Sequence, residues 1–162
     1  MAKIYLGLGS NELPEKNLAI AVHQLEIRFG YLEKSAIYQG PAVGFDGDDF
    51  LNLVVGLQSE MSPFDICNEI ECIHNFIGRE RGINKWGPRS IDIDLLLYDE
   101  LIIDEPTLQV PRADILDYGF VLQPIAEIAP HLIHPLTGIT LLEHWKSFIK
   151  KNQPLEIINI NL

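Results

Sequence analysis

The sequence lacks the features that would assign it to a membrane or a secreted class. No apolar run approaches the roughly 20 residues of a membrane-spanning helix, and the apolar part of the N-terminus is too short for a signal peptide. There are 2 cysteines, Cys67 and Cys72, and their spacing fits neither a CxxC motif nor a zinc site. We therefore expect a cytoplasmic protein, free of membrane contact, in which both thiols are buried or half-buried.

Basic residues are scarce and unevenly distributed. The chain has 12 Lys and Arg against 23 Asp and Glu, a net charge of −11, which argues against general nucleic-acid binding. No Lys or Arg occurs in residues 35–78, and then Arg79, Arg81, Lys85 and Arg89 follow within a short segment. A basic cluster in an acidic chain indicates a local anion site, although a solvated charged loop is the alternative.

Two nucleotide-binding motifs are also missing. The chain has no GxxxxGK[ST] phosphate-binding loop and no glycine-rich loop of the protein-kinase type, which excludes the two common ATP-binding folds. Its 162 residues, 47% apolar and 22% charged, are typical of one globular domain, and no repeat, low-complexity stretch or linker divides them. We expect a single domain over residues 1–162.

The spacing of apolar and turn residues predicts strands and helices in a definite order. Pro14 and the Ser62-Pro63 pair should begin helices, and Gly30 and Gly78 should end them. The predicted elements are a strand at 3–8, a helix at 14–28, strands at 34–39 and 50–58, a helix at 63–77 and a strand at 90–97. After these we expect a hairpin return at 101–103, a loop at 105–111, two short helices within 112–127, a helix at 140–150 and a tail, 152–162, that could form an edge strand. This order is typical of a ferredoxin-like α+β domain with antiparallel neighbouring strands.

Asp92 and Asp94 are the clearest candidates for chemistry. They are separated by one residue in a predicted strand, so both carboxylates face one side, roughly 6–7 Å apart, while Ile93 faces the other. Carboxylates this close repel each other unless a cation lies between them, and hard oxygen ligands of this type suit Mg²⁺. A polar, solvent-facing side of a strand is the alternative.

Other side chains are candidates for ligand contacts. Arg89 precedes the first aspartate by three residues, so its guanidinium could pair with phosphates that a metal holds. Phe50 and Asn52 share one face of their strand, where a ring and an amide could recognise a flat heterocycle. Packing in the core is the alternative for Phe50, and Phe120 has the same two interpretations.

Several segments form a recognisable combination of motifs. They are YLGLGSN at 5–11, FLN at 50–52, GRER at 78–81, WGPRSIDIDLLL at 86–97, and GFVLQP followed by EIAP between 119 and 130. Together they resemble the 6-hydroxymethyl-7,8-dihydropterin pyrophosphokinase family of folate synthesis, and the run that begins at Trp86 is highly specific. The resemblance implies a three-layer α/β/α, ferredoxin-like fold with a mainly antiparallel sheet. It also implies a monomeric, ATP-dependent diphosphotransferase that acts on small molecules.

The reaction implied by the resemblance is pyrophosphoryl transfer. The hydroxymethyl oxygen of the pterin attacks the β-phosphorus of ATP, and AMP leaves. Asp92 and Asp94 would bind two Mg²⁺ ions, and Arg79 and Arg89 would act with them as catalytic residues. By the same resemblance, the pterin would contact Gly40, Pro41, Val43, Phe50, Asn52 and Phe120. The nucleotide would contact Glu71, His74, Arg81, Trp86, Arg89, Leu95 and Arg112.

The chain departs from the family's pattern near the expected nucleotide. His74 stands where the family commonly has Glu, Arg112 where it has His after the Val-Pro pair, and Tyr118 where it has Arg. The pterin and metal residues match. A non-catalytic pterin-binding relative is the alternative suggested by these changes. A glycosyl or nucleotidyl transferase that uses Asp92 and Asp94 is a more distant one.

Overall fold

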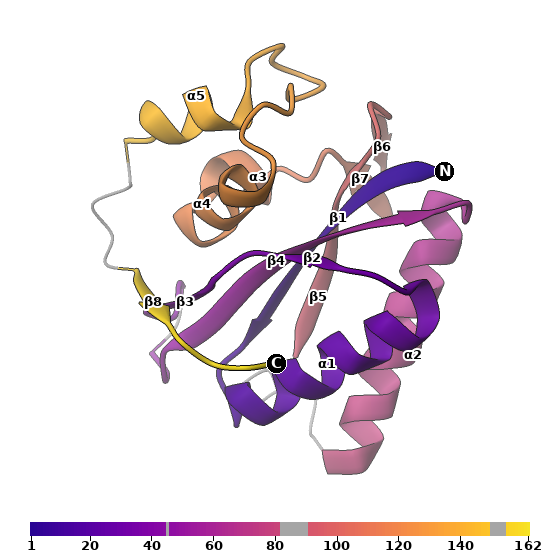
Figure 1. Cartoon of the computed structure of the whole chain (residues 1–162), viewed down its shortest axis with the longest axis vertical. Helices are drawn as coiled ribbons and strands as arrows, with labels where there is room; N and C mark the ends of the chain where they lie inside the picture. The colour runs from indigo at the N-terminus through magenta and orange to yellow at the C-terminus, as the bar shows by residue number, and fades with distance from the viewer. Residues whose placement is uncertain (45, 82–90, 150–154) are drawn as a thin grey trace.

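An antiparallel β-sheet forms the centre of the computed structural model, which describes residues 1–44, 46–81, 91–149 and 155–162 (Figure 1). The strands follow the order β5-β1-β4-β3-β8, and β2 also pairs with β4. Their bounds are Ala2–Ser10 (β1), Glu33–Lys34 (β2), Ile37–Gly40 (β3), Phe50–Ser59 (β4), Asp92–Tyr98 (β5) and Glu156–Ile158 (β8). Each of these strand pairings is antiparallel, as the sequence predicts.

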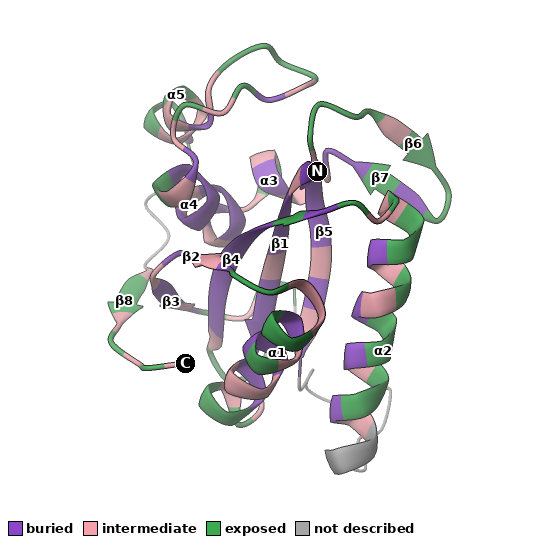
Figure 2. Cartoon of the chain, turned by 45° about the vertical axis from the view of Figure 1, so that its right-hand side comes forward, coloured by how far each residue is buried: buried purple, intermediate pink, exposed green. Residues whose placement is uncertain are grey.

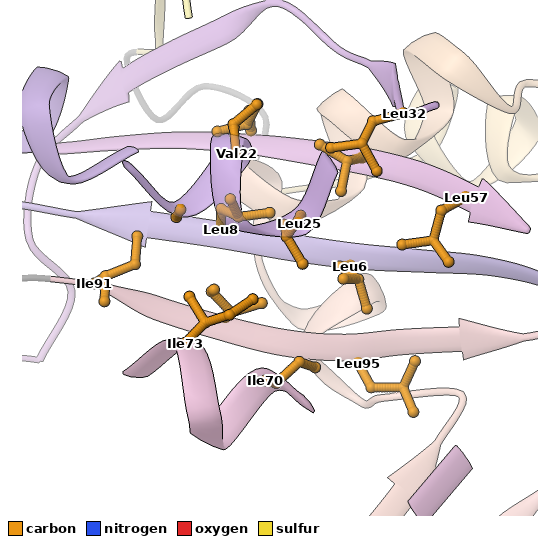
Figure 3. Close-up of a cluster of buried hydrophobic side chains, with 14 of the residues drawn as sticks. Leu6, Leu8, Val22, Leu25, Leu32, Leu57, Ile70, Ile73, Ile91 and Leu95 are labelled. Atoms are coloured by element: carbon orange, nitrogen blue, oxygen red, sulfur yellow. The ribbon is translucent and has the colours of Figure 1, made fainter. Parts of the chain in front are cut away.

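Helices α1 (Pro14–Phe29) and α2 (Pro63–Arg81) cover one face of the sheet (Figures 1 and 3). They pack on the side of β1 that carries Ile4, Leu6 and Leu8. Each helix buries a stripe of apolar side chains at helical spacing, which is why these segments form helices against this sheet. The stripes are Leu18, Ala21, Val22 and Leu25 in α1, and Ile66, Ile70, Ile73 and Ile77 in α2.

A second helical layer covers the opposite face of the sheet, which completes the three layers that the resemblance implies (Figure 2). It contains α3 (Asp114–Asp117), α4 (Gly119–Ile128) and α5 (Leu141–Lys146). Val121, Leu122 and Ile125 of α4 belong to one buried cluster with Tyr5 of β1 and Leu96 of β5. In the described part of the chain, no helix has the length and apolar character needed to cross a membrane.

Local signals place most helix ends where the sequence predicts them. Pro14 lies in the first turn of α1, and Gly30 ends this helix with a φ of 79° and donates its N–H to the carbonyl of Glu26 at 2.8 Å. The hydroxyl of Ser62 accepts the N–H of Asp65 at 3.2 Å at the start of α2. This bond satisfies one of the unpaired donors of the first turn.

The predicted end of α2 at Gly78 is wrong, because the helix continues to Arg81. Gly30, Gly44 and Gly138 have a positive φ, whereas Gly78 keeps the helical conformation of its neighbours. A glycine inside a helix costs about 1 kcal/mol relative to alanine, which the buried isoleucines of α2 offset. Arg79 and Arg81 therefore belong to the last turn of the helix instead of a loop after it.

Two other predicted segments differ from the structure. The strand expected at 34–39 is divided into β2 and β3 at Ser35, whose hydroxyl accepts the N–H of Val54 at 2.9 Å in place of a backbone carbonyl. The segment at 101–111 contains a hairpin of β6 (Ile103–Glu105) and β7 (Leu108–Val110), where we expected an earlier return strand and a loop. The expected edge strand in the tail is confirmed, because β8 pairs with β3 at the end of the sheet.

Candidate active site

The two aspartates of β5 project towards the layer that contains α3 and α4. Asp92 pairs with Gly9 of β1 and Asp94 pairs with Gly7, so neither carboxylate meets a side chain of its partner residue. Both aspartates are half-buried, whereas Ile93 between them is buried in the opposite core. The strand thus aims both carboxylates at one cavity, in agreement with the alternation in the sequence.

Asn52 reaches the same face from β4 because Gly9 leaves room for its side chain. Gly9 pairs with Asn52 on one side and with Asp92 on the other. A Cβ atom added to Gly9 would lie 2.7 Å from Oδ1 of Asn52, so the amide would have to move. The glycine therefore leaves the space that the asparagine amide occupies. In the sequence Gly9 is one glycine of the YLGLGSN motif, and nothing in that motif predicts its role in the site.

A cavity of about 880 Å³ opens above these residues. Five of the six residues expected to contact a pterin line it: Pro41, Val43, Phe50, Asn52 and Phe120. Gly40, the sixth, ends β3 opposite Phe50 and does not belong to the lining. Tyr118 also lines the cavity and stacks on Phe120, with ring centroids 5.1 Å apart, although the sequence did not identify it as a contact. Aromatic walls with a buried amide suit a flat heteroaromatic ligand.

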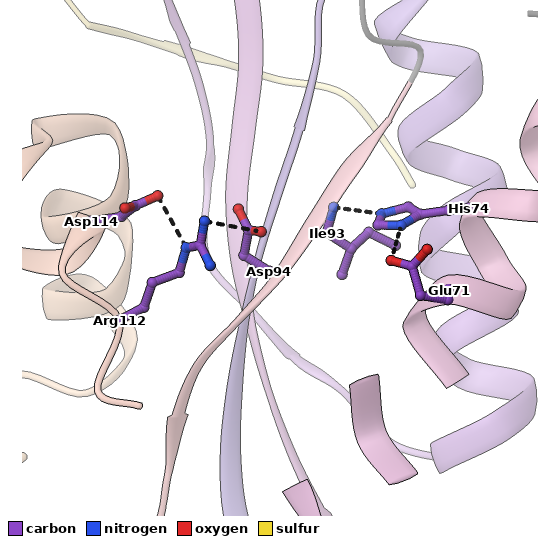
Figure 4. A network of polar contacts seen from close by, with 6 residues as sticks. All are labelled: Glu71, His74, Ile93, Asp94, Arg112 and Asp114. Atoms are coloured by element: carbon purple, nitrogen blue, oxygen red, sulfur yellow. Dashed lines mark hydrogen bonds and ion pairs between the residues drawn. The ribbon is translucent and has the colours of Figure 1, made fainter. Parts of the chain in front are cut away.

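Arg112 lies between Asp94 and Asp114 (Figure 4). Its Nη2 is 3.6 Å from Oδ1 of Asp94, and its Nε donates to Oδ2 of Asp114 at 3.1 Å. The backbone N–H of Arg112 donates to the carbonyl of Leu96 at 2.9 Å, which ties this segment to β5. Arg112 thus holds its position through both its backbone and its side chain.

Electrostatics make Asp94 a carboxylate that favours a nearby cation. Burial, and then the charge of Asp92, raise the pKa of Asp94 to about 6, although Arg112 opposes the shift. A divalent cation would stabilise the charged form and lower this pKa. No group of three or more His, Cys, Asp and Glu side chains that could hold a metal occurs among the described residues. Two carboxylates nevertheless fit Mg²⁺, which commonly completes its coordination with water and substrate phosphates.

A second cavity, of about 820 Å³, adjoins the same ion pair at the outer edge of β5. Asp94 and Arg112 line both cavities. The remaining walls come from α2, from β5 and from the β6–β7 hairpin, and they include Glu71 and Leu95, which were expected near a nucleotide. The hairpin residues 104–109 were not identified from the sequence, because their place beside β5 depends on the tertiary fold.

His74 is not in the lining of either cavity. Its Nε2 accepts the backbone N–H of Ile93 at 2.9 Å, and its Nδ1 lies 3.0 Å from Oε1 of Glu71 (Figure 4). Both ring nitrogens therefore have protein partners. The structure places this residue against the backbone of β5, although the sequence predicted a nucleotide contact.

The remaining candidates, three arginines and a tryptophan, lie where the structure gives no side-chain description. Arg79 and Arg81 are in the last turn of α2, but their side chains are outside the described part of the chain. Trp86 and Arg89 fall within residues 82–90, which also lie outside it. Their predicted contacts with the nucleotide and its phosphates remain predictions.

Comparisons with known proteins find similar sequences over most of the chain. The model of the family described as 7,8-dihydro-6-hydroxymethylpterin-pyrophosphokinase (HPPK) matches residues 5–130. A 2-amino-4-hydroxy-6-hydroxymethyldihydropteridine pyrophosphokinase of Aquifex aeolicus is 37% identical over 139 residues, which cover 84% of this chain and 86% of that protein. A protein of the same name from Methylorubrum extorquens is 39% identical over 138 residues, which cover 82% of this chain and 86% of that protein.

Longer proteins contain a similar unit. The chain is 31% identical to the folic acid synthesis protein fol1 of Pneumocystis carinii over 90% of its own length, but it spans only 20% of that protein. The solved structure of Plasmodium falciparum HPPK-DHPS shares the fold, with a TM-score of 0.75 at 13% identity over 93% of this chain and 45% of that one. Given the match over residues 5–130 and the identity to relatives of similar length, the chain belongs to the 7,8-dihydro-6-hydroxymethylpterin-pyrophosphokinase family.

Proposed function

We propose that this protein transfers the pyrophosphoryl group of ATP to 6-hydroxymethyl-7,8-dihydropterin in folate biosynthesis. The hydroxymethyl oxygen forms a bond to the β-phosphorus, the bond from that phosphorus to the α–β bridging oxygen breaks, and AMP leaves while the hydroxyl proton is lost. The observation that carries the proposal is the meeting of two cavities at Asp94 and Arg112. One cavity has the walls of a heterocycle site, and the other opens beside the same carboxylate, so two substrates can meet there.

The cavity lined by Phe50, Asn52 and Phe120 is the proposed pterin site. Asn52 has an exposed fraction of 7%, so its amide must find polar partners inside the cavity or the protein. The edge of a pterin offers both donors and acceptors to such an amide, while its faces can stack on phenylalanine rings. Gly40, Pro41 and Val43 would border the ligand from the end of β3 and the loop that follows it.

Asp92 and Asp94 are the residues that would hold Mg²⁺, and we propose two ions, as the resemblance of the sequence implies. When bound, Mg²⁺ withdraws negative charge from phosphate oxygens and so favours attack at phosphorus. The chain itself holds the two carboxylates on a paired strand, so little reorganisation is needed when the charge of the phosphates arrives.

The second cavity is the proposed nucleotide site, with Glu71, Leu95 and Arg112 in its walls. The guanidinium of Arg112 could replace its contact with Asp94 by one with a phosphate oxygen of the nucleotide. The contact with Asp94 is the longer of its two ion pairs, and the one with Asp114 would remain. We also propose that Arg79, Arg81, Trp86 and Arg89 contact the nucleotide and its phosphates. The protein would act as a cytoplasmic monomer with one domain, residues 1–162, and would bind neither nucleic acid nor membrane.

The test is product analysis with purified protein, Mg²⁺, ATP and the hydroxymethyl pterin. We expect AMP to appear in equal amount to the pyrophosphorylated pterin. Asp94→Asn should abolish turnover, whereas the exposed control Asp65→Asn on α2 should leave it unchanged. Release of ADP instead of AMP, or no reaction with the unmodified protein, would contradict the proposal.

A further inference from the structure

The backbone of Ile93 is held by a histidine from another element. β5 is the last strand in the sheet order and pairs with β1 on one side. On its other side the N–H of Ile93 donates to Nε2 of His74 on α2, at 2.9 Å. Ile93 is the residue between the two aspartates, so this bond holds the Asp92–Ile93 peptide, one of the two peptides that join them.

The hydrogen bond from Ile93 determines which nitrogen of His74 carries the proton. A nitrogen that accepts a hydrogen bond cannot carry a proton, so Nε2 is unprotonated and the neutral ring carries its proton on Nδ1. That proton points to Oε1 of Glu71, 3.0 Å away. The His74 side chain is 21% exposed and Glu71 is 69% exposed, so the bond to Ile93 is the better shielded of the two contacts.

We propose that His74 is a positioning residue that holds the Asp92 and Asp94 carboxylates in the geometry that a metal requires. This inference rests on the proposed function, which assigns the metal to these aspartates. Mg²⁺ demands near-ideal octahedral geometry, so a small rotation of the Ile93 peptide would separate two ligands that must act together. An edge strand has no second strand to resist that rotation, and His74 supplies the missing restraint.

Direct contact between His74 and the nucleotide is the competing role, and the geometry disfavours it. Both ring nitrogens have partners within the protein, and the ring lies outside the lining of the cavity beside β5. A residue that acts through the backbone should change metal affinity while leaving metal-free nucleotide affinity unchanged.

Two substitutions of His74 by amide residues distinguish the contribution of Nε2 from that of Nδ1. His74→Gln can place its amide oxygen near the position of Nε2, where it still accepts the Ile93 N–H, whereas His74→Asn reaches only as far as Nδ1. His23→Asn is the matched control, because His23 is exposed on α1. The measurement is Mn²⁺ affinity, by electron paramagnetic resonance, with a non-hydrolysable ATP analogue present. Residues that orient metal ligands typically contribute 10–100-fold to affinity, so we expect His74→Asn to weaken Mn²⁺ binding by about 10-fold.

His74→Gln should keep most of the Mn²⁺ affinity, and His23→Asn all of it. Equal affinity in both His74 variants, whether retained or lost, would overturn the inference, and so would a loss of metal-free nucleotide binding in His74→Asn. If His74→Asn fails to fold, Glu71→Leu replaces it, because Glu71 is exposed and its loss frees the ring. Glu71 also lines the proposed nucleotide site, so Mn²⁺ affinity is then measured without the nucleotide analogue. We expect a smaller decrease in this affinity, and no decrease would overturn the inference. If the unmodified protein binds no Mn²⁺, the proposed metal site itself fails. If the unmodified protein binds Mn²⁺ and the His74 variants bind it equally well, only the proposed role of His74 is contradicted.

Discussion

At the scale of single residues, Gly9 and Asn52 determine the shape of the proposed pterin site. The space above Gly9 is filled by Oδ1 of Asn52, and a methyl group there would approach this oxygen to 2.7 Å. We expect Gly9→Ala to push the asparagine amide out of place. Because a displaced amide loses hydrogen bonds, pterin binding should weaken by about 1–3 kcal/mol, measured by calorimetry.

Gly7→Ala is the matched control for this prediction. A methyl group at Gly7 would meet the side chain of Leu96 at 3.3 Å, which a small movement of a flexible leucine relieves. Both glycines lie on one face of β1 and line the same cavity. An added methyl group would lie nearest to the polar Oδ1 of Asn52 at Gly9, but nearest to the apolar side chain of Leu96 at Gly7. Equal loss of pterin affinity in both variants would show that strand packing, not the amide of Asn52, controls the site.

The raised pKa of Asp94 predicts how stability depends on pH in metal-free protein. Its pKa rises from 3.8 to about 6 on folding, so the folded chain holds this proton more tightly than the unfolded chain. Between these values stability falls as pH rises, and above about 6 the folded state carries the full cost of the buried charge. Asp94→Asn should therefore raise the free energy of unfolding at neutral pH by about 1–3 kcal/mol.

Chemical denaturation with a chelator present, over about pH 4 to about pH 7, would check this prediction. The substitution should flatten the part of the pH profile that belongs to Asp94. A less stable Asp94→Asn protein at neutral pH would mean that the contact with Arg112 outweighs the cost of burial.

At the scale of elements, α2 contains a glycine that its fold does not need. Gly78 has a helical conformation, and a Cβ atom added to it would have no neighbour within 4 Å. Gly78→Ala should stabilise the protein by about 0.5–1 kcal/mol, because alanine restricts the unfolded chain and fits the folded one. Thermal unfolding measures this change.

Gly30→Ala provides the opposite case with the same chemical change. Gly30 also has open space around it, but its φ of 79° is one that alanine rarely adopts. We therefore expect Gly30→Ala to destabilise the end of α1, so that the two substitutions change the stability of the protein in opposite directions. Destabilisation by both would indicate that the end of α2 needs the freedom of Gly78 for the segment that follows.

At the scale of the whole molecule, alternation and local signals predicted the order of the elements and the aspartate strand, while the three layers were implied by the resemblance to a family. The polar–apolar pattern around Ile93 placed both carboxylates on one face without reference to any other element. Features that join distant segments could not be predicted in the same way. The contact of Arg112 with Asp94, and that of His74 with Ile93, depend on where a hairpin and a helix lie beside β5.

Two errors in the predicted elements have a common physical origin. Both segments were interpreted from local propensity alone. At Gly78 the packing of α2 keeps the chain helical, and at Ser35 a hydrogen bond from the N–H of Val54 to the side-chain hydroxyl interrupts the predicted strand. Five of the six residues that the resemblance implies as pterin contacts line one cavity of the structure, the proposed pterin site. It did not identify Gly9 or Tyr118, whose roles follow from contacts between strands and between rings.

The three-residue strand β8 has a consequence for self-association. An open sheet exposes unpaired backbone groups at its edges, and such edges can recruit strands of other chains into aggregates. β8 covers β3, whose Ile37 and Tyr38 would otherwise offer an apolar template, and its own short length leaves little for a further strand to pair with. At the opposite edge, His74 occupies the amide of Ile93. β8 and His74 therefore leave fewer unpaired backbone groups at the two edges of the sheet to which a strand of another chain could pair.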